Sequence, residues 1–348
     1  MDEHKRYKAD SYVYTLLPDG TAEIIQCEAC YDDETIPEIL EGHRVTAIGE
    51  EAFEGFSMLT AVTVPEGVIR MGRRVFLRNE ALERVTLPDS LTDVGEGLFE
   101  GCDEMKEVLI SPNHPVLTLV DGALYDRTKK CLLWVPPTQE GDFAVLPGTR
   151  VIGESAFEGC SSLKRITLPE SLETVGDRAF CYCNTLERLE IPEGVTEIGV
   201  LAFQGCVRLR EIHLPAALTC LGVGAFKFCK ELETVEIPAG VTIIRGETFM
   251  DCRLLRHVSL PDGLDCIHDD AFFNCGCLRD LELPDSLTWL GRWAFFSCQS
   301  LTHLILPAGL KDIGDNAFKA CWNLTVSCAP GSPAEQYCRD NGMAMAKA

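Results

Sequence analysis

The chain has 348 residues, of which 46% are hydrophobic, and its 31 Lys and Arg against 54 Asp and Glu give a formal net charge of −23. This hydrophobic content supports a large buried core and excludes a largely disordered chain. The negative charge repels phosphate backbones and anionic lipid, so we expect no nucleic-acid partner, and it favours basic or mixed-charge protein partners.

The N-terminal segment MDEHKRYKADSY is charged and lacks the apolar stretch of a signal peptide. No run approaches the roughly 18 apolar residues of a membrane-spanning helix, so we expect no membrane insertion. The sequence as written, with its many unpaired cysteines, predicts a cytoplasmic protein, and a cell-surface protein if an export signal has been removed.

Cys27 and Cys30 have the C-x-x-C spacing. A second such pair would indicate a zinc site, and a thioredoxin-like context would indicate redox activity. Neither context is present, so we interpret this pair as structural.

From residue 42 the sequence is a tandem repeat with a usual period of 23 residues. One unit, PEGVTEIGVLAFQGCVRLREIHL (192–214), has apolar residues at positions 4, 7, 11, 12, 18, 21 and 23, and Gly at position 8. A fixed period in this range predicts a solenoid, because stacked coils bury a face that one coil cannot bury alone. Eleven units share a Phe at position 12: Phe53, Phe76, Phe99, Phe157, Phe180, Phe203, Phe226, Phe249, Phe272, Phe295 and Phe318.

Positions 18–23 of a unit alternate apolar and polar residues, which predicts a short strand that ends at the Pro of position 1. Stacked coils then form a parallel sheet with about 4.8 Å per coil and a column of Phe rings. Gly at position 8 allows a positive φ or a close approach between coils. Arg245 and His268 replace this Gly in two adjacent units. Gly246 can absorb the first change by a one-residue shift, and we expect strain or a widened turn at His268.

Nine of the eighteen cysteines occupy position 15. A free Cys packs as a small apolar residue, so this column predicts a ladder of buried thiols. Disulfides or a metal column are the alternatives. The nine are Cys102, Cys160, Cys183, Cys206, Cys229, Cys252, Cys275, Cys298 and Cys321.

The motif LxxVxLPxxVxxIGxxAFxxC, which runs over about residues 42–345, resembles the BspA-type leucine-rich repeats of bacterial and some protozoan proteins. This resemblance implies an α/β repeat solenoid, a right-handed superhelix with one parallel β-sheet on the concave face and short helical or irregular turns on the convex side. It also implies a β-hairpin that opens the chain, with Asp19-Gly20 as its turn, a hairpin insertion around residues 120–137, and a short C-terminal helical cap.

The expected organisation has five parts. They are an N-terminal cap (1–41), three repeats (42–110), the hairpin insertion (111–146), eight repeats (147–329) and a C-terminal cap (330–348). Members of the resembled family mostly bind host, matrix or other proteins, usually at the cell surface.

Function is expected at strand positions 20 and 22, which face outward and vary without harm to the core. Cations lie towards the first half of this strip and carboxylates with histidines towards the second. The strip is suited to an extended charged peptide or a protein edge, and a merely solvated sheet face is the alternative. The candidate residues are Arg165, Arg188, Glu190, Glu211, His213, Glu236, His257, Asp280, Glu282 and His303.

His213 and His257 are two coils apart, and so are His257 and His303, so the backbones of each pair are separated by about 10 Å. A zinc ion needs nitrogens about 2.1 Å away, so the three cannot share one ion, although a pairwise site with Glu236 or Asp280 stays open. We expect no metal and no cofactor.

Trp289 and Trp293, with Phe273 and Phe296, lie outside the core positions. Exposed aromatic residues are enriched at interfaces, so this patch is a candidate for partner binding or self-association, with packing on the convex side as the alternative.

No Ser or Cys has a partnered His and acid, and no phosphate-binding glycine loop occurs in the sequence. We therefore expect no enzyme. The sequence predicts a non-catalytic scaffold that binds a protein or peptide through its concave face. An adhesin-like module of a bacterial surface is the alternative.

Overall fold

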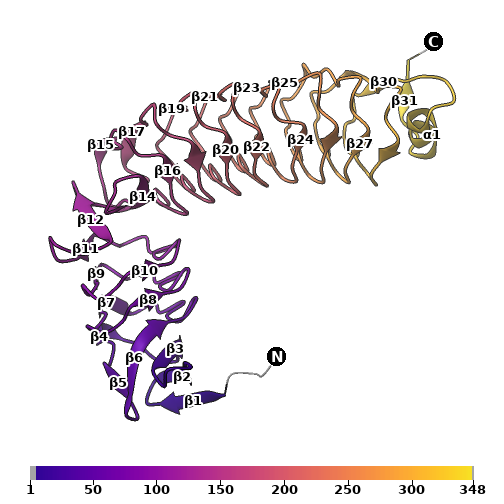
Figure 1. The fold of residues 1–348 in the computed structure, drawn as a ribbon. Helices are drawn as coiled ribbons and strands as arrows, with labels where there is room; N and C mark the ends of the chain where they lie inside the picture. The colour runs from indigo at the N-terminus through magenta and orange to yellow at the C-terminus, as the bar shows by residue number, and fades with distance from the viewer. Residues whose placement is uncertain (1–4, 347–348) are drawn as a thin grey trace. The chain divides into compact units, whose positions relative to one another are not determined.

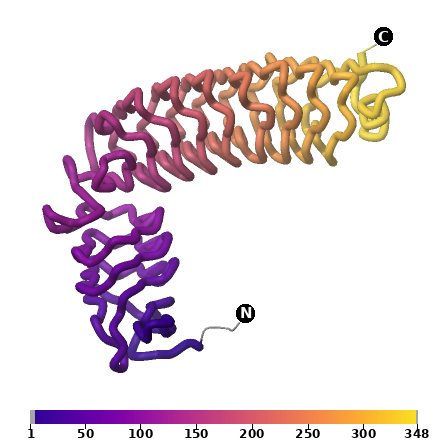
Figure 2. Tube along the Cα trace, in the orientation of Figure 1, coloured from indigo at the N-terminus to yellow at the C-terminus, as the bar shows by residue number. Residues whose placement is uncertain are grey.

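The computed structural model describes residues 5–346, so the outermost ends of the two predicted caps lie outside the described residues. The chain divides into two compact units. Unit 1 comprises Met1–Gln139 and Ile152–Cys160, and unit 2 comprises Glu140–Val151 and Ser161–Ala348. Within each unit the chain winds in stacked coils (Figures 1 and 2), which confirms the predicted leucine-rich-repeat solenoid.

Unit 1 opens with the predicted hairpin, whose turn at Asp19-Gly20 uses a glycine φ of +85°. Its three antiparallel strands are β1 (Arg6–Ala9), β2 (Tyr12–Leu16) and β3 (Ala22–Cys27). The first sheet continues with β5 (Ile39–Leu40), β6 (His43–Ile48), β8 (Arg70–Met71) and β10 (Asp93–Val94). The second, parallel sheet contains β4 (Asp32–Thr35), β7 (Leu59–Thr63), β9 (Arg84–Thr86) and β11 (Glu107–Leu109).

The insertion of unit 1 is an antiparallel meander of β12 (Leu117–Val120), β13 (Ala123–Asp126) and β14 (Cys131–Trp134). Asp126 closes the β13–β14 turn, because its carboxylate accepts hydrogen bonds from the main-chain N–H of Thr128 at 3.1 Å and of Cys131 at 2.6 Å. Trp134 packs edge-on against Phe99 with ring centroids 5.4 Å apart. The insertion thus adds the next aromatic ring to the Phe column.

Unit 2 begins with β15 (Gly141–Ala144) and β17 (Leu163–Thr167), and β16 (Val151–Ile152) lies between them in sequence. One column of parallel strands contains β19 (Arg188–Glu190), β21 (Glu211–His213), β23 (Thr234–Glu236), β25 (His257–Ser259), β28 (His303–Ile305), β30 (Thr325–Ser327) and β31 (Ala344–Met345). A second column contains β18 (Thr174–Val175), β20 (Glu197–Ile198), β22 (Cys220–Leu221), β24 (Ile243–Ile244), β26 (Cys266–Ile267), β27 (Trp289–Leu290) and β29 (Asp312–Ile313).

The second strand column is the main difference from the expected single sheet with helical turns. The two residues that directly precede the Gly of position 8 form a short strand, which pairs in parallel with the same two residues of the next coil. Glu197–Ile198, for example, pairs with Cys220–Leu221. Within residues 5–346 the only helix is α1 (Pro333–Asp340), which begins at the cap residue Ser332 and packs Tyr337 against Phe318 with ring centroids 6.3 Å apart. The expected C-terminal cap is therefore present.

The core of unit 2 is the predicted column of Phe rings. Phe180, Phe203, Phe226 and Phe249 are fully buried and stack at 5.1 to 5.6 Å. Area alone makes each buried ring worth about 1.5–3 kcal/mol.

The Gly column serves a close approach between coils. A Cβ on Gly222 would lie 2.3 Å from the carbonyl of Gly199. His268 occupies the same repeat position, yet its N–H donates to Ile244 at 2.8 Å, as Gly222 does to Ile198. The main-chain register therefore continues unchanged through His268, and the expected widening does not occur there.

The cysteine ladder is confirmed as a set of free, mostly buried thiols. Seven of the nine thiols donate to the carbonyl of the Phe one coil earlier, for example Cys206 to Phe180 at 3.1 Å and Cys252 to Phe226 at 3.0 Å. Cys160, which follows the insertion, donates instead to Pro136 at 3.6 Å. The exception among the eighteen cysteines is the pair after the opening hairpin, because Cys27 and Cys30 form a disulfide.

Candidate functional site

The strongest candidate site is the outward side of the first strand column in unit 2, from β17 to β28, here called the strand face. In β19 the residues Arg188, Leu189 and Glu190 are exposed, buried and exposed, and β21 and β23 repeat this pattern. The buried middle residue anchors each strand to the core. Its two neighbours must therefore project outward, because side chains alternate along a strand.

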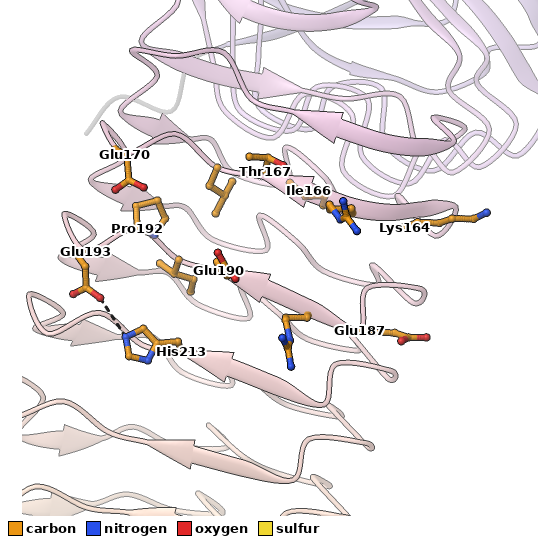
Figure 3. Close-up of a pocket in the computed structure, with 13 residues that line it drawn as sticks. Lys164, Ile166, Thr167, Glu170, Glu187, Glu190, Pro192, Glu193 and His213 are labelled. Atoms are coloured by element: carbon orange, nitrogen blue, oxygen red, sulfur yellow. Dashed lines mark hydrogen bonds and ion pairs between the residues drawn. The ribbon is translucent and has the colours of Figure 1, made fainter.

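Three adjoining grooves follow the strand face. The first, of about 760 Å³, includes Lys164, Arg165, Glu190 and His213 in its lining (Figure 3). The second, of about 680 Å³, extends from Arg188 and Glu190 to His257. The third, of about 640 Å³, reaches Glu282, His303 and Ile305. The strand face is thus hollowed along several consecutive coils.

The structure brings ten of the twelve sequence-derived candidates to these grooves, and leaves Trp289 and Trp293 outside them. The ten are Arg165, Arg188, Glu190, Glu211, His213, Glu236, His257, Asp280, Glu282 and His303. Sequence reasoning missed Lys164 at position 19 and Glu170 and Glu193 at position 2, which also line the first groove. Both positions adjoin the strand but lie outside the two outward positions that were considered.

Several charges on or beside the strand face are already paired within the chain. Arg188 forms an ion pair with Glu211 of the next coil. His213 Nε2 lies 3.2 Å from Glu193 Oε1, the contact drawn as a dashed line in Figure 3. Beside these columns, residues at position 19 form ion pairs with position 17 or 19 of the next coil: Glu187–Arg208 at 2.6 Å, Arg210–Glu231 at 3.0 Å and Glu233–Arg256 at 3.6 Å.

Five charged groups of the strand face have no such partner. Within residues 5–346 no opposite charge lies within ion-pair distance of the exposed carboxylates of Glu190, Glu236 and Glu282, nor of the exposed cations Lys164 and Arg165. The unpaired cations lie at the β17 end and the unpaired carboxylates follow from β19 onward. These five charges are not neutralised by an ion pair within the described residues.

The histidines do not converge on a common point. His257 pairs in the strand ladder with Asp280, and His303 Nε2 lies 3.1 Å from Ser327 Oγ. In the part of the chain that the structure describes, no three His, Cys, Asp or Glu side chains are grouped as metal ligands. The chemistry that this surface offers is charge and hydrogen-bond complementarity.

The four candidate aromatic residues do not line these three grooves, and each packs against a neighbouring side chain. Phe273 and Phe296 stack at 4.8 Å, and the ring of His268 lies edge-on to Trp289 at 5.1 Å. The Arg292 guanidinium covers the ring of Trp293 at 4.5 Å. A role in self-association stays a prediction. Trp322, with 80% of its surface exposed, is the most exposed large apolar side chain of the described residues and was not singled out from the sequence.

Comparison with known proteins places this architecture among bacterial repeat proteins. The family model described as "BspA type Leucine rich repeat region" matches six copies over residues 23–129, 142–255 and 242–332. No curated protein matches the sequence. No helix of residues 5–346 is long and apolar enough to cross a membrane.

Two solved structures share the fold. A leucine-rich repeat protein from Eubacterium ventriosum is 21% identical, with 83% of this chain and 93% of that chain covered and a TM-score of 0.59. A leucine rich cell surface protein from Faecalibacterium prausnitzii is 22% identical, with 100% and 99% covered and a TM-score of 0.56. At these identities the similarity establishes the fold alone.

Proposed function

Because this chain belongs to the BspA-type leucine-rich repeat family, we propose that it is a non-catalytic scaffold that binds a protein or an extended peptide through the strand face. One observation carries the proposal: ten variable, charged or polar side chains line three adjoining grooves on strands that the buried core holds in place. Rigid strands limit the entropy that the surface loses on binding.

A capture experiment tests this proposal. Cross-linked partners of the full chain are compared with those of Arg188→Glu, which removes an exposed strand-face cation, and of Glu197→Lys, which changes an exposed residue of β20 in the other strand column. We expect Arg188→Glu to change the captured partners, because it reverses a charge of the strand face and frees Glu211, and we expect Glu197→Lys to retain them. Equal capture by both variants and the unaltered chain would remove the strand face as the binding surface.

We also propose display on the bacterial cell surface. Its support is the family membership and the similarity to a protein described as a leucine rich cell surface protein. Labelling of intact cells with a membrane-impermeant amine reagent should modify the exposed lysines, such as Lys164. Labelling only after lysis would instead support the cytoplasmic location expected from the sequence as written.

A further inference from the structure

Three carboxylates of the strand face recur with a fixed period. Glu190, Glu236 and Glu282 occupy position 22 of alternate units, since 236 − 190 and 282 − 236 are both 46 residues. All three are exposed, and His213 and Ser259 take the same position in the intervening coils. We propose that this row is a docking surface for a polyproline-II peptide segment that carries a Lys or Arg at every third residue. This proposal rests on the binding function proposed above for the strand face.

The spacing of the row follows from the sheet. Glu190 pairs in register with His213, and Glu236 pairs in register with Ser259. The bridges Glu211–Thr234 and His257–Asp280 join the remaining neighbouring coils in the same register, although Glu282 itself follows the second bridge and lies outside a strand. Neighbouring strands lie about 4.8 Å apart, which places carboxylates of alternate coils about 9.6 Å apart. A partner must present its cations at this interval.

Among regular backbones, polyproline II fits this interval best. It has three residues per turn and rises about 3.1 Å per residue, so every third side chain lies on one face at about 9.3 Å. An extended β-strand presents same-face side chains at about 6.8 or 13.6 Å. An α-helix reaches about 10.5 Å only between residues seven apart, and those residues drift by about 20° per heptad.

The peptide cannot pair as a further β-strand at the middle of the row. β21 and β23 are each paired on both sides, so their main-chain groups are already used. Recognition must therefore use side chains and grooves, as in the docking of proline-rich segments. The second groove runs from Glu190 to Glu236 and is lined by the imidazoles of His213 and His257, which offer flat surfaces to the intervening proline rings.

Two cations lie at the Glu190 end of the row, and the apolar Ile305 takes position 22 after Glu282. Lys164 and Arg165 line the first groove next to Glu190 and would repel a further cation of the ligand. The other nearby cations are held by their own partners, such as Arg188 by Glu211. The row therefore offers three free carboxylates to three cations of the ligand.

Fluorescence anisotropy with the full chain tests the spacing. The probe is a labelled (Pro-Pro-Lys)₃ peptide, and its matched control is Pro-Pro-Pro-Lys-Lys-Lys-Pro-Pro-Pro, with the same composition and charge. We expect the contiguous-lysine peptide to bind at least about tenfold more weakly, because only one carboxylate of the row is within its reach. Binding of both peptides with equal affinity, or of neither, would overturn the proposal.

Two protein variants complete the test. The double variant Glu236→Ser/Ser259→Glu keeps the net charge but breaks the interval, and we expect it to lose about tenfold in affinity for (Pro-Pro-Lys)₃. The variant Glu197→Gln/Asp312→Asn/Asp340→Asn removes three exposed carboxylates elsewhere and should stay within about twofold. Circular dichroism verifies that both are folded.

An unchanged affinity of the double variant would refute the fixed interval. The capture experiment with Arg188→Glu does not depend on this interval. The wider proposal of strand-face binding is thus judged separately.

Discussion

The ring of Phe226 shows how one residue stabilises the stack. It is fully buried and contacts Phe203 at 5.3 Å and Phe249 at 5.6 Å, so its removal leaves a cavity between coils. We expect Phe226→Ala to lower the free energy of unfolding by about 3–5 kcal/mol, measured by urea denaturation. Trp322→Ala, at an exposed ring, should change it by no more than about 0.5 kcal/mol. Similar effects of the two substitutions would contradict this account of the core.

The ladder thiols make stability dependent on pH. Burial raises the pKa of Cys102 to about 12, and it also raises the pKa of Cys206 and Cys252. A raised folded-state pKa stabilises the fold below the unfolded value of about 8.5, and this contribution is lost as the pH rises towards the folded-state value. We expect the free energy of unfolding to fall between about pH 8.5 and pH 11. The free energy of unfolding should fall less steeply with pH in Cys252→Ala than in the unaltered chain. Equal slopes in the two proteins would refute the assignment of this pH dependence to the buried thiols.

At the scale of elements, α1 depends on its N-cap residue, Ser332. Ser332 Oγ accepts a hydrogen bond from the main-chain N–H of Glu335 at 3.2 Å. Ala334 and Cys338 form the buried face of the helix. We expect Ser332→Ala to destabilise the cap by about 1 kcal/mol. Hydrogen exchange of residues 333–340 should accelerate, whereas exchange in β19–β25 should not. Uniform acceleration would mean that the cap and the coils open together.

The elements also show what the sequence can and cannot predict. The Phe column, the thiol ladder and the first strand column were predicted because their residue patterns recur in most or all of the units. The second column was not, because a two-residue strand such as Glu197–Ile198 shows no period-two pattern. The ion pairs of Glu154 with Arg73 and Arg74, both at 2.6 Å within unit 1, join residues about eighty positions apart and leave no local signal.

The candidate site was predicted to a similar extent. Alternation along the strands identified the outward residues, since it depends only on backbone geometry. The pairing of His213 with Glu193 and the isolation of Glu190 depend on how neighbouring coils are positioned. The sequence of one unit does not contain that information.

At the scale of the whole molecule, coils of equal length are interchangeable. Deletion of residues 192–214 removes one complete unit and brings Pro192's equivalent, Pro215, directly after Ile191. Each coil contacts mainly its neighbours, so we expect the shortened chain to stay folded and monodisperse by circular dichroism and size-exclusion chromatography. Deletion of residues 192–203 alone breaks the register of the Phe and Cys columns and should cause aggregation. A folded product in that case would contradict the coil model.

The hydrogen-bonded thiols give the solenoid an internal set of reporters. Cys206, Cys229, Cys252 and Cys275 lie one per coil, and each is closed off from solvent. A thiol reagent reaches a given sulfur only when its own coil opens, so the labelling rate at each cysteine measures the local opening free energy. Mass spectrometry of partially labelled protein would therefore yield a profile of opening along unit 2, with one value for each coil and no substitution required.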